Sequence, residues 1–527
     1  MPNKSSKPKI EIYDTTLRDG SQGEGISFSV QDKLRITEKL DWFGVDFIEG
    51  GWPGSNPKDL EFFKEAKKLK LKHAKLAAFG STRRAGIKAS DDANLNFLIE
   101  SGTEVITIFG KSWDLHVTKV FGVSLEENLK MIDDSVRYLR SKKKRVVYDA
   151  EHFFDGYKAN PAYALKAIGA AAAAGAETIV LCDTNGGTMP SEVAQIVKAV
   201  AKKVRAPLGI HTHNDCAMAV ANAIAAVESG ARHAQGTING FGERCGNADL
   251  LSIAANLQLK YGYQCVPDIR KLTELSRFVG EVGNLVLQNN QPYVGKSAFA
   301  HKGGVHINAV MKHPVTYEHV RPEEVGNERR FLTSEMMGKT HVMLKAKSWQ
   351  IDLAKDNPKT GEILKEIQKL ENEGYQFEAA EASFELVVRR VMAGKHKFFE
   401  FGKVEVLAEN LADGNPVARA QVTATVNGKS ASGDATGDGP VNALDKALRK
   451  ALIGFYPALA DMHLSDFKVR VLDQKAGTAA KVRVFIESRD EKRVWTTVGI
   501  SENIIEASWK ALVDSIEYKL LKDGVGK

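Results

Sequence analysis

The stretch LGIHTHND, residues 208–215, ends a short apolar run on two histidines, His211 and His213. In a β-strand the side chains alternate between the two faces, so residues two apart point the same way. Two imidazoles on one face can hold a metal ion, but they can equally form hydrogen bonds inside a fold. The motif alone leaves both interpretations open, and its place in the chain has to decide between them.

This apolar run is one of eight short β-rich runs in the first half of the chain. Their starts lie roughly 25 to 40 residues apart, which is the spacing of strand–helix units. The runs are KIEIYD (9–14), VDFIEGG (45–51), AKLAAF (74–79), EVITIFG (104–110), RVVYDAE (145–151), TIVLCDT (178–184), LGIHTHN (208–214) and HAQGTING (233–240).

The segments between these runs have the patterns of helices. In residues 29–44 the apolar side chains recur close to the 3.6-residue period of an α-helix. The alanine-rich segment 160–177 has Pro161 near its start, where proline suits the first helical turn. Eight strand–helix units in about 250 residues predict a (β/α)8 TIM barrel, and a doubly wound open sheet is the alternative.

The composition is that of an ordinary globular protein, with 43% apolar and 26% charged residues. The net charge of +7 is small for 527 residues and argues against nucleic-acid binding. No apolar run reaches the ~18 residues of a membrane span, and the first residues lack the apolar core of a signal peptide. Four cysteines without a CxxC pattern predict reduced thiols, so we expect a cytoplasmic protein.

A barrel would bring polar residues from several strands together, because barrel active sites lie at the carboxyl ends of the strands. Polar clusters occur at six such ends: DTTLRDG (14–20), Glu49, Glu151, Asp183–Asn185, His211 with His213, and NGFGERCGN (239–247). A purely structural protein has little reason to gather carboxylates, histidines and glycines at one rim. We therefore predict an active site at this rim.

Two histidines and one carboxylate are a common ligand set for a divalent ion that keeps positions open for substrate. Asp19 is the candidate carboxylate, because Asp14 lies inside the first strand and is expected to order the following loop. Arg18 always carries its charge and suits an oxygen that becomes negative during a reaction. A surface salt bridge is the alternative role for Arg18.

The loop GFGERCGN, residues 240–247, also contributes to this rim. Its glycines let the backbone pass close to a ligand, and Asn247 is placed to reach a metal ion or its bound water. We expect Glu243 and Arg244 to pair with each other and hold the loop.

Three motifs, YDTTLRDGSQ, HTHND and NGFGERCGN, occur in this order. Together they resemble the acyl-CoA Claisen-condensing family that contains 2-isopropylmalate synthase, homocitrate synthase and citramalate synthase. Hydroxymethylglutaryl-CoA lyase shares the barrel and the metal site. The resemblance covers nearly the whole chain, and FIEGGWPGSNPKD (47–59) resembles the citramalate synthase branch more than the isopropylmalate branch.

The resemblance implies an acyltransferase that condenses acetyl-CoA with a 2-oxo acid and then hydrolyses the thioester. The branch implies (R)-citramalate formation from acetyl-CoA, pyruvate and water, in isoleucine biosynthesis. The alternatives are a 2-isopropylmalate synthase, which uses 2-oxoisovalerate in the leucine pathway, and a lyase that runs the reverse cleavage.

The resemblance also implies roles for the residues at the rim. Asp19, His211 and His213 would bind a divalent metal ion, Mn or Mg, with Zn and Co as further options, and Asn247 would lie close behind them. Arg18 would bind substrate and stabilise the developing oxyanion. Thr184, in LCDTNGG, would donate a hydrogen bond to the carboxylate of the oxo acid.

The catalytic base implied by the resemblance is His306, in HKGGVHINAV (301–310), supported by the carboxylate of Glu151. In the family this histidine reaches the barrel of the partner subunit, so a homodimer is functional. His301, five residues earlier, is the rival candidate for the base.

The second half of the chain predicts two further parts. After the barrel (1–275) we expect a helical linker (276–379) that contributes His306, and then an α+β domain (380–527). Within this domain residues 435–452 resemble residues 496–516, which predicts two related β/α repeats that pack together. The resemblance implies regulation by a branched-chain amino acid, isoleucine, bound between the repeats, and a dimerisation module without a ligand is the alternative.

Overall fold

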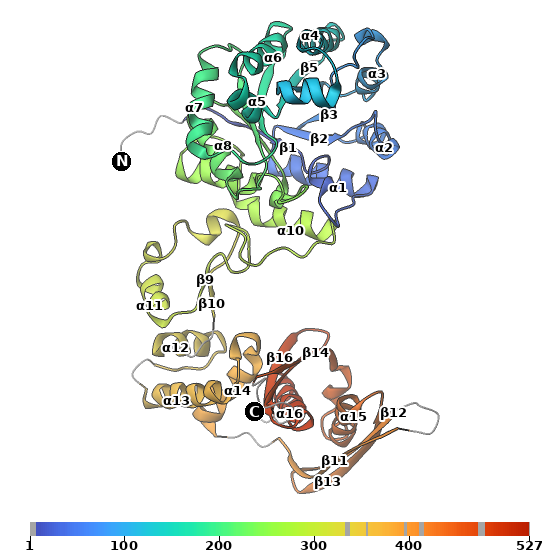
Figure 1. Ribbon diagram of the computed structural model, residues 1–527. Coiled ribbons are helices and arrows are strands. Elements are labelled where there is room, and N and C mark those ends of the chain that lie inside the picture. Colours follow the sequence, from blue (N-terminus) through green and yellow to red (C-terminus); the bar gives the residue numbers. More distant parts are fainter. Residues whose placement is uncertain are drawn as a thin grey trace. The chain divides into compact units, whose positions relative to one another are not determined.

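The computed structural model describes residues 7–332, 338–354, 357–394, 398–410, 416–472 and 480–525. The chain forms two compact units, and each is considered by itself (Figure 1). The first unit comprises residues 1–299 with 319–329, and the second comprises residues 300–318 with 330–527.

The first unit is a closed barrel of eight parallel strands in chain order, so the predicted TIM barrel is confirmed. The strands are β1 (Glu11–Asp14), β2 (Phe47–Gly51), β3 (Lys75–Ser81), β4 (Val105–Lys111), β5 (Arg145–Glu151), β6 (Thr178–Asp183), β7 (Leu208–Thr212) and β8 (His233–Gly236). The barrel closes through β1 and β8, where Glu11 is in register with His233.

Helices follow the strands and cover the outside of the barrel (Figure 1). They are α1 (Val30–Phe43), α2 (Pro57–Ala66), α3 (Ala93–Glu100), α4 (Leu125–Ser141), α5 (Phe153–Ala159), α6 (Pro161–Ala173), α7 (Pro190–Ala201), α8 (Ala219–Glu228), α9 (Leu250–Ala255) and α10 (Leu272–Val282). Helix α1 begins with a capping box between Ser29 and Asp32 and ends at Gly44, whose left-handed backbone (φ 93°) terminates the helix.

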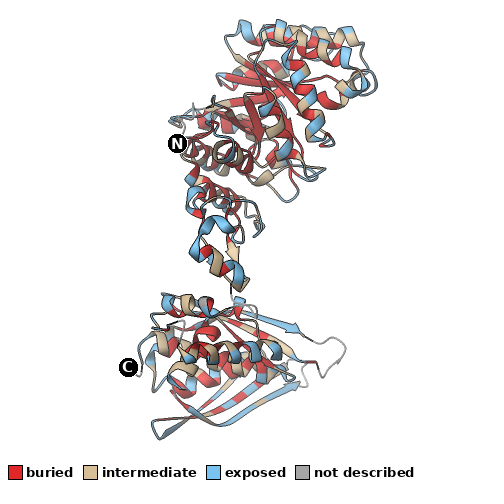
Figure 2. Cartoon of the chain, turned by 90° about the vertical axis from the view of Figure 1, so that its left-hand side faces the viewer, coloured by how far each residue is buried: buried red, intermediate tan, exposed pale blue. Residues whose placement is uncertain are grey.

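The strands of the barrel are buried on both faces, as Figure 2 shows in red. A large apolar core lies between the sheet and its helices, and a smaller cluster that includes Tyr13, Phe47 and Val180 is separate from it. The hydroxyl of Tyr13 donates to Glu49 (2.7 Å) on β2 and hydrogen-bonds Thr107 (2.6 Å) on β4, so it ties three strands together. The strands therefore form a rigid base for the loops at their carboxyl ends.

The second unit begins with a short parallel pair, β9 (Ala300–His301) and β10 (Arg330–Phe331). Its helices are α11 (Gly304–Lys312), α12 (Lys339–Ser348), α13 (Pro358–Glu373) and α14 (Glu381–Ala393). Helices α12 to α14 share an apolar core that also includes Val498 of the C-terminal domain. The domain limits at 275 and 379 stay predictions.

The C-terminal part contains the predicted repeat, and the structure confirms it as two sets of three antiparallel strands and a helix. The first set is β11 (Glu400–Asn410), β12 (Pro416–Val426), β13 (Lys429–Gly437) and α15 (Pro440–Leu452). The second set is β14 (His463–Val471), β15 (Val482–Arg489), β16 (Val494–Ser501) and α16 (Ile504–Lys522). One apolar core joins both sets, since Leu444 and Leu448 of α15 belong to the same cluster as Leu512 and Ile516 of α16.

Two further predictions concern the whole chain. All four cysteines are free thiols, as expected from their spacing. None of the helices in the described ranges is long and apolar enough to cross a membrane.

Candidate active site

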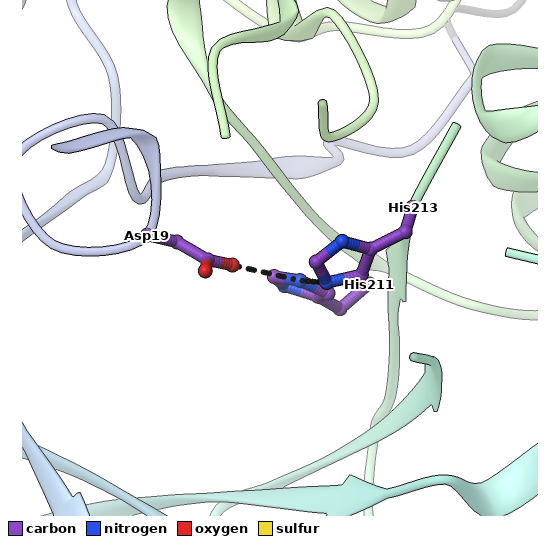
Figure 3. A group of neighbouring side chains, drawn as sticks. All are labelled: Asp19, His211 and His213. Carbon is purple, nitrogen blue, oxygen red and sulfur yellow. Dashed lines mark hydrogen bonds and ion pairs between the residues drawn. The ribbon is translucent and has the colours of Figure 1, made fainter. Parts of the chain in front are cut away.

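The structure brings Asp19, His211 and His213 together at the carboxyl end of the barrel, and all three are buried (Figure 3). The His211 Nε2 atom lies 3.2 Å from Asp19 Oδ2 and 3.3 Å from His213 Nε2. One nitrogen from each imidazole and one carboxylate oxygen all lie within 4.8 Å of one another. Three potential metal ligands therefore converge on one small volume.

The local backbone explains this convergence. His211 lies in β7, and His213 follows the strand in an isolated antiparallel bridge to Asn247, so the extended backbone continues past Thr212. Asp19 lies in the loop after β1, where its N–H donates to the carbonyl of Thr15 (2.9 Å).

As predicted, Asp14 orders the loop that carries Asp19. Its carboxylate accepts hydrogen bonds from the backbone N–H (3.1 Å) and the hydroxyl (2.7 Å) of Thr16. Burial raises the pKa of Asp14 to about 7, although both bonds from Thr16 oppose the rise. Asp14 is therefore part of the loop's support.

A second layer of side chains orients His211. Its Nδ1 lies 2.8 Å from Gln235 Oε1, and the Gln235 amide nitrogen donates to Asp149 (3.1 Å). With the amide assigned in this way, His211 Nδ1 donates to Gln235, and Nε2 is the ring nitrogen that faces Asp19 and His213. Metal-binding histidines are commonly held by such a partner on the other ring nitrogen.

The charges of the three residues suit a cation. Burial, reinforced by the nearby His211, lowers the pKa of His213 to about 3, so its imidazole is neutral. Burial alone would raise the pKa of Asp19, but the charge of Arg18, together with the hydrogen bond from His211 and the two imidazoles, outweighs it, and the pKa lies below the usual range. Burial also opposes protonation of His211, while the hydrogen bond to Asp19 and its charge raise the pKa of His211.

The side chain of Asn247 also indicates a cation-binding site. Its side chain is 2% exposed, and neither its amide oxygen nor its amide nitrogen has a hydrogen-bond partner among the described residues. Unpaired polar atoms inside a protein are costly, so such a group indicates a missing partner such as an ion or a water molecule. The donor set of two imidazoles, a carboxylate and this amide fits a divalent cation.

Arg18 is held on three sides beside the metal-ligand group. Its Nε donates to Glu49 (2.6 Å), and its Nη1 lies 3.1 Å from Asp19 Oδ1. The guanidinium carbon lies 3.7 Å from the centre of the Phe79 ring. These contacts exclude the alternative of a surface salt bridge, because the side chain is 13% exposed and Glu49 is fully buried.

A cavity of about 250 Å³ lies over these residues. Its walls are Arg18, Asp19, Gln22, Trp52, Phe79, Phe109, Asp149, Glu151, Cys182, Thr184, His211, His213, Glu243 and Arg244. Six of the eight residues to which the family resemblance assigns a metal-binding, substrate-binding or catalytic role therefore line one cavity; Asn247 and His306 are not among its walls. The sequence did not indicate the aromatic wall of Trp52, Phe79 and Phe109, because these residues lie on separate strands or loops.

Glu151 and Thr184 lie on neighbouring strand ends of this cavity. Glu151 forms an ion pair with Lys111, a buried residue that the sequence did not single out. The hydroxyl oxygen of Thr184 accepts the backbone N–H of His152 (2.9 Å), so the hydroxyl proton is left to donate elsewhere. His152 adopts a left-handed backbone (φ 55°), which is uncommon for a residue other than glycine.

The expected pair of Glu243 and Arg244 is wrong. Arg244 instead binds Asp215 in a bidentate pair (2.8 and 3.0 Å) and donates to the carbonyl of Thr184 (2.8 Å). Arg244 has a left-handed backbone (φ 56°), a conformation that the sequence did not reveal. The bidentate pair joins the loops after β7 and β8.

The two histidines proposed as the base belong to the second unit and differ in their surroundings. His301 Nε2 lies 3.2 Å from Glu318 Oε1, and its side chain is 10% exposed. His306 is exposed on α11, and its ring stacks on Tyr317 with 4.2 Å between the centroids. His301 is thus engaged within the unit, whereas His306 presents its ring to the outside of that unit.

Comparison with protein families identifies three segments. Residues 9–279 match the HMGL-like family, residues 293–375 match the homocitrate synthase post-HMGL domain-like family, and residues 378–520 match the LeuA allosteric (dimerisation) domain. Together these matches cover the barrel, the helical segment and the repeat domain.

Several known proteins are similar to the chain over nearly their full length. The chain is 55% identical to the (R)-citramalate synthase of Geobacter sulfurreducens, covering 97% of this chain and 98% of that protein. It is 54% identical to the (R)-citramalate synthase of Aquifex aeolicus, covering 98% of both chains. Identity to the 2-isopropylmalate synthase of Methanocaldococcus jannaschii is 32%, covering 99% of this chain and 97% of that protein.

Replacing either histidine tests the metal-ligand assignment. We expect His211→Ala and His213→Ala to weaken Mn²⁺ binding by more than about 100-fold, since loss of an outer-shell partner alone typically costs 10–100-fold. Calorimetric titration of the folded variants with Mn²⁺ measures this, with circular dichroism to verify the fold. His73→Ala, which removes an exposed histidine before β3, should bind like the unchanged protein. Unaltered affinity in both site variants would contradict the assignment.

Proposed function

The chain belongs to the HMGL-like family and, within it, to the (R)-citramalate synthases, and we propose that it condenses acetyl-CoA with pyruvate and water to give (R)-citramalate and CoA. The observation that carries this proposal is the cavity of about 250 Å³. It combines a ligand set for a divalent cation, a fixed guanidinium and an available hydroxyl donor within a space that suits a small oxo acid.

The oxo acid is bound by groups with complementary charge. A divalent cation held by Asp19, His211 and His213, with Asn247 beside them, would supply a Lewis acid for the keto oxygen of pyruvate. Mn²⁺ and Mg²⁺ are the proposed ions. The hydroxyl of Thr184 donates to the carboxylate of pyruvate, because its oxygen already accepts the N–H of His152.

Arg18 stabilises the negative charge that forms during the reaction. Its guanidinium is fixed by Glu49, Asp19 and the Phe79 ring, so little reorganisation is needed when an oxygen becomes an anion. A fixed donor that meets charge in a site with little water is an effective source of transition-state stabilisation.

His306 of a second copy of the chain removes a proton from the methyl group of acetyl-CoA. The exposure of His306 on α11 supports this role, as does the engagement of His301 with Glu318. The carboxylate of Glu151, at the end of β5, orients His306 and favours the protonated form of its imidazole. The resulting enolate carbon attacks the keto carbon of pyruvate, and water cleaves the thioester to release CoA.

The aromatic wall supports pyruvate over larger oxo acids. Phe79 and Phe109 are stacked with 5.6 Å between ring centroids, and Trp52 meets both edge-on at 5.8 and 5.7 Å. The indole N–H of Trp52 donates to Asn94 (2.7 Å), which fixes the ring. Rigid aromatic walls leave space for a methyl group and disfavour the isopropyl group of 2-oxoisovalerate.

Release of free thiol from acetyl-CoA tests the proposed reaction. With pyruvate, 2-oxoisovalerate and 2-oxoglutarate side by side, we expect kcat/KM for pyruvate to exceed the others by at least about 10-fold, the effect of an added methylene group in a close-fitting pocket. Phe109→Ala should enlarge the cavity and so reduce the ratio of kcat/KM for pyruvate to kcat/KM for 2-oxoisovalerate. A preference for 2-oxoisovalerate in the unchanged enzyme would identify a 2-isopropylmalate synthase instead.

Exchange of the acetyl-CoA methyl hydrogens in deuterated water tests the base. We expect His306→Ala to slow this exchange by about 100-fold or more, the usual contribution of a general base. His301→Ala is the matched control. Because the base is proposed to come from the partner, mixing inactive His306→Ala with inactive Asp19→Ala chains should restore part of the activity. Normal exchange in His306→Ala, or no restoration on mixing, would contradict the proposal.

The LeuA-type domain of the chain is proposed to bind isoleucine and to slow the barrel from a distance. An effector acts through different affinities for two states of the enzyme, typically with a 5–150-fold change in ligand affinity. A truncation within α14 would not isolate the role of this domain, because α14 shares an apolar core with Val498 of the C-terminal domain.

Titration of the full-length enzyme is the appropriate measurement of regulation. We expect isoleucine to bind and to lower the rate at subsaturating acetyl-CoA by about 5-fold or more, with leucine less effective. Calorimetry measures the binding and thiol release measures the rate. If neither amino acid binds at millimolar concentration or changes the rate, the domain serves dimerisation alone.

A further inference from the structure

Among the residues that the structure describes, the carboxylate of Glu151 has one charged partner, the ammonium of Lys111. The two residues end the neighbouring strands β4 and β5 and lie opposite each other in the register of the parallel sheet. The side chain of Lys111 is 9% exposed, and that of Glu151, which lines the active-site cavity, is 25% exposed. Lys111 is not among the cavity walls, so it meets the carboxylate from outside the cavity.

Two aromatic rings and a helix hold Lys111 in this position. Its ammonium lies 5.5 Å from the centre of the Phe109 ring and 5.3 Å from that of Phe121, which ends the short π-helix His116–Phe121. Both distances are within the range of a cation–π contact. The backbone carbonyl of Lys111 accepts from the side-chain amide of Asn128 on α4 (2.8 Å). Lys111 is therefore fixed at its backbone and at its ammonium, and Phe109 connects it to the aromatic wall of the cavity.

The ion pair is not needed to join the ends of the two strands. The hydroxyl of Ser112 donates to the carbonyl of Glu151 (2.6 Å), and the N–H of Ser112 donates to the same carbonyl (3.3 Å). These bonds continue the contact between the strands past the last residue of β4. A buried ion pair also adds little to stability, because both charges lose their hydration. A buried lysine on an active-site carboxylate therefore indicates a role in the site.

Building on the proposed function, we propose that Lys111 is a positioning residue for the reaction and that it acts through Glu151. Its ammonium binds one carboxylate oxygen, Oε2, and the other oxygen, Oε1, has no hydrogen-bond partner among the described residues. Oε1 is available to accept the N–H of His306 from a second copy of the chain. Lys111 itself contacts neither substrate nor metal ion, and it takes part in no covalent step.

The carboxylate needs this anchor because the Glu151 side chain has several rotatable bonds and lies at the edge of the cavity, where it can turn toward water. An ammonium on one oxygen fixes the direction of the other. The histidine then meets an acceptor that is already in place, and a displacement of about 1 Å in such a group can cost about 100-fold in rate.

The alternative role for Lys111 is direct contact with the negative charge of a substrate. The cavity argues against this role, since Phe109 and Glu151 stand between Lys111 and the bound oxo acid as parts of the wall. The two roles differ in a double-mutant cycle. A residue that acts through Glu151 loses its effect once the carboxylate is removed, whereas a residue that contacts the substrate keeps its effect.

Exchange of the acetyl-CoA methyl hydrogens in deuterated water is the measurement, applied to Lys111→Met, Glu151→Gln and the double variant. Methionine is similar to lysine in length and lacks its charge. Lys111→Arg keeps the charge and can still bind a carboxylate. Lys119→Met, which removes an exposed lysine of the π-helix, is the matched control. Circular dichroism verifies the fold, and calorimetric titration measures the Kd for pyruvate.

We expect Lys111→Met to slow the exchange about 10-fold or more, as a displaced catalytic group does, and to leave the Kd for pyruvate unchanged. The double variant should exchange at the rate of Glu151→Gln alone. Lys111→Arg should exchange faster than Lys111→Met, and Lys119→Met should match the unchanged enzyme.

Three results would overturn the role of Lys111: normal exchange in Lys111→Met, losses that multiply in the double variant, or exchange in Lys111→Arg that is as slow as in Lys111→Met. A higher Kd for pyruvate in Lys111→Met would overturn it in favour of direct substrate contact. In each of these cases the unchanged enzyme still exchanges the methyl hydrogens, so the proposed function stands. No exchange and no thiol release in the unchanged enzyme would overturn the proposed function, and the role of Lys111 with it.

Discussion

The contact between Arg18 and Asp19 sets the charge balance on which the rest of the barrel mouth depends. Three carboxyl groups, Asp19, Glu49 and Asp149, surround this single guanidinium inside a buried site. Burial raises the pKa of Asp149 to about 7, and the nearby Glu49 adds to the rise. Carboxylates in excess over cations in a low-dielectric interior favour the binding of a positive ion beside His211.

The barrel supplies the rigidity that this charge arrangement needs. Glu49 accepts from Tyr13 of β1 as well as from Arg18, so the interior hydrogen bonds connect the strands to the loop that carries Arg18 and Asp19. Gln235 of β8 joins His211 to Asp149 in the same way. Glu49 and Gln235 both lie on strands, so a shift of β2 would displace the guanidinium of Arg18, and a shift of β8 would displace the imidazole of His211.

The sequence predicts the parts of this site that depend on local periodicity. The eight β-rich runs all became strands, and the spacing of His211 and His213 was sufficient to predict that they lie together. Contacts across the barrel could not be predicted, because Phe79 and Phe109 belong to different strands and each resembles an ordinary core residue.

Backbone conformation accounts for the rest of what the sequence did not reveal. The pairing of Arg244 with Asp215 depends on a left-handed residue in a loop, and the sequence does not mark it. In the C-terminal domain the strand–glycine–helix pattern occurs twice, and that repetition made both copies predictable.

Under the proposed function, the residues of the reaction are divided between the two compact units. Asp19 and Arg18 belong to the first and His306 to the second, so the rate depends on how well α11 presents its histidine. Helix α11 contacts α12, and α12 shares an apolar core with α14 and with Val498 of the second repeat. A ligand that shifts the repeats can therefore reach His306 through packed side chains of one unit, without altering any residue around the metal ligands.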